Sequence, residues 1–187
     1  MSSKRRGILF WISAWLPVAV GIFLVTVEST AAFGADRTSH PLRWLVQLLF
    51  GQLSDATWDP VHHLLRKSGH FLGYGALGLA WLRAWRMTLS TPRTKTYPRG
   101  SRFSTPRTKT CPRGPRLPDT RFLSQAGLAL LGTALVASWD EWHQTFLPNR
   151  QGSPWDVLLD CCGAAVMIGM AGLYLRYFRR AKPASEN

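Results

Sequence analysis

Long uncharged runs restrict what this chain can fold into. Residues 7–27 form a run of 21 without a charged side chain, and residues 122–139 form a run of 18. Residues 157–175 add a run of 19 whose only charge is Asp160. A helix of about 20 apolar residues crosses a hydrocarbon core of roughly 30 Å. These three runs therefore predict transmembrane helices.

A fourth, shorter run covers residues 68–82, with 15 uncharged residues. Lys67 on one side and Arg83 on the other can extend their stems toward the membrane surfaces and lengthen this run. Gly69 and Gly73 are four residues apart in it, a spacing that favours close contact with another helix. The sequence thus predicts an all-α bundle of four transmembrane helices. The alternative for residues 7–27, a signal peptide, fits poorly because signal cores have about 7–15 apolar residues.

The net charge is +13, and the positive residues are clustered along the chain. Lysines and arginines gather at residues 4–6, 83–121 and 176–182, which are alternate ends of the four runs. Positive charge accumulates on the cytoplasmic side of membrane proteins. We therefore expect a multi-pass protein of the bacterial cytoplasmic membrane with both termini cytoplasmic. This distribution argues against a nucleic-acid partner and leaves the oligomeric state open.

A basic insert separates the second and third predicted helices. Residues 90–100 return almost unchanged as residues 104–114, with ten of eleven positions identical. Proline, glycine, threonine and arginine at this density cannot bury a core, so residues 87–120 are predicted to be a disordered cytoplasmic loop. The rest of residues 1–187 is expected to form a single membrane domain.

Residues 40–53, in the first outer loop, are rich in leucine and tryptophan but too short to span a membrane. Two interpretations remain open for them. They form either a helix lying in the membrane interface or a helix packed over the bundle.

Polar side chains of both signs lie in residues 140–160, between the last two apolar runs. The predicted topology places this segment at the outer face, next to the start of the run at Ser68. Charged groups beside a membrane are costly unless they pair or have a function. The sequence therefore predicts a site here. Its candidate ligand-binding residues are Lys67, His70, Asp140, Gln144, Arg150, Ser153, Asp156 and Asp160, and its candidate catalytic residues are Glu141 and His143.

Spacing gives this site some expected geometry. Asp140 and Gln144 are four residues apart, as are Asp156 and Asp160, so each pair shares a helix face. Asp160 lies about one turn inside the last apolar run. It needs a cation, a metal ion or a proton there. Lys67 and Arg150 are the expected cations.

Three kinds of chemistry fit these residues. Arg150, followed by Ser153 as cap of a helix N-terminus, suits an anion such as a lipid phosphate or pyrophosphate. Glu141 or His143 as general base would make an enzyme acting on such a lipid. A purely structural role, in which polar groups only join the helices, also fits. A divalent metal is possible, but the Asp-Glu-x-His order differs from the His-Glu-x-x-His zinc pattern, so no cofactor is predicted.

The same residues resemble those of the VanZ-like family, which is named after a teicoplanin-resistance accessory protein. The resemblance covers about residues 60–175 without the insert. It implies a cell-envelope membrane protein, a possible link to glycopeptide resistance, and a membrane lipid or lipid-linked envelope precursor as partner. The residues that carry it are Lys67-x-x-His70 with Tyr74, then Asp140-Glu141-x-x-Gln144, then Pro148-x-Arg150-x-Gly152-Ser153-x-x-Asp156, and Gly163.

Overall fold

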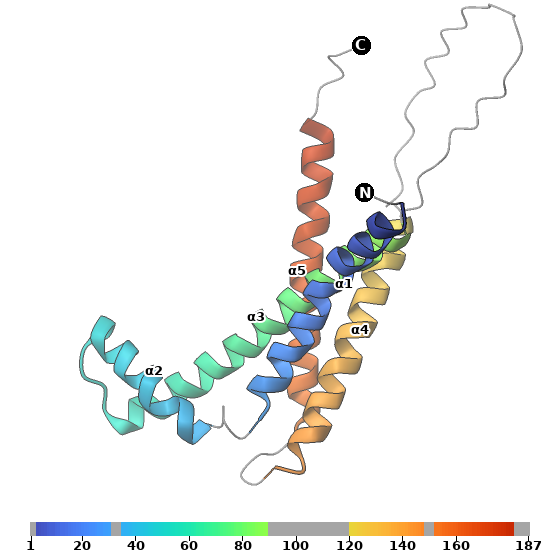
Figure 1. Cartoon of the computed structure of the whole chain (residues 1–187). Helices are drawn as coiled ribbons and strands as arrows, with labels where there is room; N and C mark the ends of the chain where they lie inside the picture. The colour runs from blue at the N-terminus through green and yellow to red at the C-terminus, as the bar shows by residue number, and fades with distance from the viewer. Residues whose placement is uncertain (1–2, 31–34, 90–119, 148–151, 182–187) are drawn as a thin grey trace, which may run out of the picture.

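The computed structural model describes residues 3–30, 35–89, 120–147 and 152–181, and the secondary structure in these residues is entirely helical (Figure 1). This confirms the predicted all-α class. The helices in chain order are α1 (Ser3–Glu28), α2 (Ala35–Phe50), α3 (Asp55–Leu89), α4 (Thr120–Gln144) and α5 (Pro154–Ala181).

Helix α3 is the centre of the arrangement. It crosses the bundle diagonally in Figure 1, and α1, α4 and α5 all pack against it. Helix α1 begins, α3 ends, α4 begins and α5 ends at one end of the bundle, the upper end in Figure 1. We call this the basic end, because it carries Arg83, Arg86, Arg121 and Arg176. The opposite end, where α2 lies, is called the site end.

Among the described residues, three helices are long and apolar enough to cross a membrane. They are Gly7–Glu28 in α1, Thr120–Gln144 in α4 and Pro154–Phe178 in α5. Helix α3 is longer, at 35 residues, but arginines and Lys67 lower its hydropathy. The count of four spans and the sidedness of the termini therefore stay predictions.

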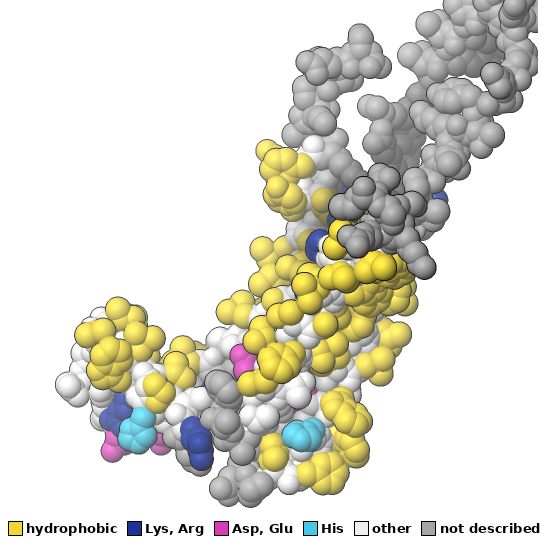
Figure 2. Space-filling model, viewed as in Figure 1, with side chains coloured by type: hydrophobic (Ala, Val, Ile, Leu, Met, Phe, Trp, Pro, Cys, Tyr) yellow, Lys and Arg dark blue, Asp and Glu magenta, His cyan; other side chains and the backbone are white. Residues whose placement is uncertain are grey.

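The outer surface of the bundle is apolar, as a membrane protein requires. Phe23 on α1, Leu135 on α4 and Leu173 on α5 are all exposed. Figure 2 shows hydrophobic side chains covering much of the visible face between the two ends. Exposed apolar surface of this extent is uncommon on soluble monomers and marks a membrane or protein interface.

Small residues set the close contact between α3 and α5. A Cβ atom on Gly163 would lie 2.2 Å from the backbone oxygen of Phe71, and one on Gly78 would lie 2.8 Å from the Cβ of Ala164. The predicted contact through Gly69 and Gly73 is wrong, because a Cβ on either would meet nothing within 4 Å. Both glycines lie on the face of α3 that carries Arg66 and His70, and Gly69 lines a cavity there instead of a helix contact.

Helix α2 is attached to α3 by polar contacts. The Trp58 indole donates to the Ser39 hydroxyl (2.7 Å), and Arg43 forms an ion pair with Asp55 (2.6 Å). The helix ends before Gly51, whose φ of +86° favours glycine. Its large apolar residues Trp44, Leu48, Leu49 and Phe50 are exposed.

The basic insert is shorter than predicted at both edges. Helix α3 continues to Leu89 and α4 begins at Thr120. Residues 90–119, with the internal repeat and the predicted disorder, lie outside the described residues.

Candidate functional site

The end of α4 carries a row of buried polar side chains. Asp140, Glu141 and Gln144 are each 6 % exposed. One Asp140 oxygen accepts hydrogen bonds from the Gln144 amide and from the Tyr74 hydroxyl of α3, each at 3.1 Å. The predicted pairing of Asp140 with Gln144 on one helix face is therefore confirmed. Neutral donors at the carboxylate reduce the cost of burying it.

Glu141 joins α4 to the start of α5. Its carboxylate accepts a hydrogen bond of 2.7 Å from the Ser153 backbone N–H. The Ser153 hydroxyl in turn accepts from the Trp155 N–H (3.2 Å), which makes Ser153 the predicted N-cap of α5. Residue 152 has no room for a side chain, because a Cβ atom there would lie 2.3 Å from the Glu141 backbone oxygen. Glycine fits this position because it has no Cβ.

Lys67 joins α3 to the first turn of α5. Its ammonium lies 2.7 Å from a carboxylate oxygen of Asp156, and the two side chains are 41 % and 32 % exposed. The sequence offered Lys67 as one of two cations for Asp160. Lys67 pairs with Asp156 instead.

Asp160 is the most deeply buried acid of the site, at 0 % exposure. Neither of its oxygens has a hydrogen-bond partner among the described residues. Its nearest basic group there is the His70 imidazole, with Nδ1 at 3.7 Å from Oδ1. His70 also stacks against Tyr74, the donor to Asp140. His70 thus lies next to Asp160 and next to the tyrosine that binds Asp140.

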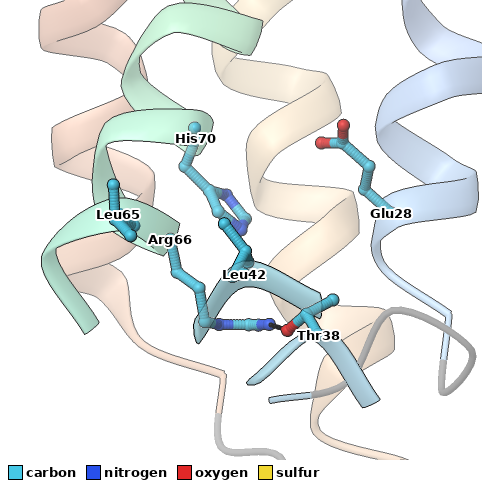
Figure 3. Close-up of a pocket in the computed structure, with 7 residues that line it drawn as sticks. Glu28, Thr38, Leu42, Leu65, Arg66 and His70 are labelled. Carbon is cyan, nitrogen blue, oxygen red and sulfur yellow. Dashed lines mark hydrogen bonds between the residues drawn. The ribbon is translucent and has the colours of Figure 1, made fainter. Parts of the chain in front are cut away.

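The other side of His70 faces a cavity of about 240 Å³. Figure 3 shows the imidazole entering this cavity from α3, one turn beyond Arg66. Glu28 at the end of α1 lies across the cavity from Arg66, and Thr38 of α2 accepts a hydrogen bond from the Arg66 guanidinium at 3.4 Å (Figure 3). The full lining is Glu28, Thr38, Leu42, Leu65, Arg66, Gly69 and His70.

The structure thus joins the three predicted segments, α3, the end of α4 and the start of α5. Two predicted residues do not join the cluster. His143 is exposed on α4, unlike its neighbours Glu141 and Gln144. Arg150 lies outside the described residues.

Sequence reasoning missed Arg66, Glu28 and Thr38. Arg66 had a usable signal, since it is four residues before His70 and shares its helix face. Glu28 and Thr38 had none, because their place depends on how α1 and α2 pack on α3. No group of three His, Cys, Asp or Glu side chains in the described parts of the chain could hold a metal ion.

Comparison with known proteins assigns the family. A family model described as VanZ/LLP1 matches residues 9–175. The chain belongs to the VanZ-like family. The match runs from α1 to α5 and includes the whole site of this VanZ-like protein. No curated protein matches it significantly. No solved structure does so either. Family membership and three apolar helices of spanning length indicate a membrane protein.

Proposed function

We propose that this VanZ-like protein binds the anionic headgroup of a membrane lipid or lipid-linked envelope precursor in the cavity beside His70. The observation that carries the proposal is the position of Arg66 and His70, one helical turn apart on the cavity wall. Guanidinium and imidazolium groups both donate to phosphate oxygens, and arginine does so with two parallel donors.

The cavity also suits the rest of a lipid-linked molecule. Leu42 and Leu65 give it apolar walls next to the polar ones. Helix α2, which forms one side, exposes Trp44 and Leu48 and therefore suits the headgroup layer of a membrane. Both features support a ligand with a charged head and an apolar chain.

The acid opposite Arg66 restricts the headgroup. The Glu28 carboxylate lines the far wall of the same cavity (Figure 3). It would repel a second anionic group but accept hydrogen bonds from a hydroxyl or ammonium. The preferred ligand therefore carries a phosphate next to a hydrogen-bond donor, as a glycosyl or amino-alcohol phosphate does.

We place the cavity at the outer face of the bacterial cytoplasmic membrane. The support is the charge pattern, which favours the basic end as the cytoplasmic one. The link to teicoplanin resistance rests on the family's name alone.

A second candidate function is catalysis on the same class of lipid. The observation that favours it is His70 between the cavity and buried Asp160. In this arrangement His70 takes a proton from water as the water oxygen bonds to phosphorus. The phosphoester bond then breaks, and His70 returns the proton to the oxygen of the leaving alcohol. His70 is then a further candidate base beside Glu141 and His143, of which His143 is exposed on α4.

The test compares polyprenyl phosphate with the matching polyprenol as ligands of the purified protein in nanodiscs. We expect the phosphate to bind more tightly than the alcohol, with an affinity that falls at high salt. Arg66→Gln should weaken phosphate binding by about tenfold, because one charge-assisted hydrogen bond contributes about that much to the affinity. Arg37→Gln is the matched control, since Arg37 is an exposed arginine outside the cavity.

Equal binding by the wild-type protein and Arg66→Gln would refute the proposed site. Arg150→Ala tests the predicted anion-binding role of Arg150, a residue that lies outside the described ones. For catalysis, His70→Asn should abolish phosphate release even at lipid concentrations that saturate the variant. If binding and turnover stay unchanged in every variant while thermal stability falls, the polar cluster has a structural role only.

A further inference from the structure

A second cavity lies at the basic end, far from the site just described. It has a volume of about 480 Å³ and is lined by α3 and α5. Its polar lining consists of Arg83 and Arg86, one turn apart on α3. Its apolar lining consists of Leu79, Leu82, Met87 and Ala171.

The packing of the helices leaves this cavity open as a groove along α3, and we call it the groove. Helices α1 and α5 both pack on α3, but within the described residues they do not contact each other. The face of α3 between them therefore forms the floor of the groove. Arg83 donates a hydrogen bond of 2.5 Å to the Ser13 backbone oxygen of α1. This hydrogen bond holds one of the two arginines of the groove in place.

Within the part of the chain that the structure describes, no acid pairs with Arg83 or Arg86, the arginines of the groove. Two arginines above an apolar groove are complementary to a molecule with an anionic head and an apolar tail.

We propose that this groove binds an anionic phospholipid of the inner leaflet. The phosphate lies at Arg83 and Arg86, and an acyl chain runs along Leu79 and Leu82 toward the middle of the bundle. A nucleic acid or a phosphopeptide fits less well, because the walls below the arginines are apolar. The proposal is independent of the cavity beside His70.

The experiment is native mass spectrometry of the full chain with added phosphatidylglycerol or phosphatidylcholine. The wild-type protein should retain phosphatidylglycerol in preference. Arg83→Gln with Arg86→Gln should weaken that binding about tenfold or more. Each basic side chain near an anionic lipid contributes roughly fivefold to the affinity. Inorganic phosphate should not compete, because the groove selects a lipid.

Arg121→Gln with Arg176→Gln is the matched control. It removes the same charge from the same end, at two exposed arginines outside the groove. If it weakens binding as much as the groove variant, the effect is general surface charge and the proposal fails. Equal retention of both lipids by the wild-type protein also overturns it.

A third variant covers misfolding of the arginine variant. Leu79→Phe keeps both charges and fills part of the groove. It should lower phosphatidylglycerol retention while the thermal midpoint without lipid stays near the wild-type value. Unchanged retention would refute the groove. Arg66→Gln should leave this binding intact, which separates the outcome from that of the cavity beside His70.

Discussion

The Lys67 ammonium and the Asp156 carboxylate meet at 2.7 Å and connect the middle of α3 to the first turn of α5. The two residues are 89 positions apart in the chain. Asp156 is also placed where the N-terminus of a helix favours negative charge. One contact therefore serves both the fold and the geometry of the site.

This ion pair should contribute modestly to stability. Both side chains are partly exposed, so a double-mutant cycle with Lys67→Met and Asp156→Asn should give a coupling of at most about 1 kcal/mol. Unfolding in mixed detergent micelles measures it. The reversed pair, Lys67→Asp with Asp156→Lys, should recover only part of the loss, because it places a cation at a helix N-terminus. Fully additive single variants would show that the pair has no energetic role.

Gly163 should be much less tolerant of alanine than Gly73. A Cβ on Gly163 would lie 2.2 Å from the Phe71 backbone oxygen, and backbone atoms of two packed helices cannot both give way. Gly163→Ala should destabilise the bundle by about 1–3 kcal/mol, the usual cost of overpacking. Gly73→Ala is the control, since nothing lies within 4 Å of its added Cβ. Equal thermal midpoints for the two variants would contradict the observed α3–α5 contact.

Local patterns predicted the helices and much of the site. The apolar runs predicted α1, α4 and α5, and the spacing of Asp140 and Gln144 predicted the shared helix face on which they form a hydrogen bond. Ser153, the predicted cap, correctly marked the start of α5. These features depend on residues within one or two turns of each other, which is the range over which sequence spacing fixes geometry.

The missed features depend on the rotation of one helix against another. Gly69 and Gly73 have the spacing of a contact, but Gly75 and Gly78 make it. The cavity has the same origin, since Glu28 reaches it from α1 and Thr38 from α2. Rotation follows from the sum of all packing contacts, and no single motif specifies it.

The attachment of α2 should weaken in mild acid. His62 lies against Trp58 and within 3.3 Å of the Thr38 hydroxyl of α2, and burial, followed by the charge of Arg66, lowers its pKa below 6.5. A base with a lowered pKa in the folded state contributes stability above the unfolded value of 6.5, and that stability is lost as pH falls below it. Hydrogen exchange of Ala35–Phe50, corrected for the intrinsic pH effect, should therefore accelerate in acid.

The control for this pH effect is His62→Gln. Glutamine keeps a hydrogen-bonding group near Thr38 but has no proton to gain. Exchange of α2 in this variant should be nearly independent of pH after the same correction. If the wild-type protein and the variant show the same pH dependence, another group controls the attachment of α2.

The fourth span can be tested with a native cysteine. Replacement of Cys161 and Cys162 by alanine leaves Cys111, in the insert, as the single thiol. If α3 crosses the membrane, an impermeant maleimide should label Cys111 in inverted vesicles and leave it unlabelled in right-side-out ones, because the insert is then cytoplasmic. If α3 stays on the outer side, the labelling pattern reverses. Ser54→Cys, introduced with Cys111→Ser in that same variant, is the control, because residue 54 precedes α3 and should react from the outside in both cases.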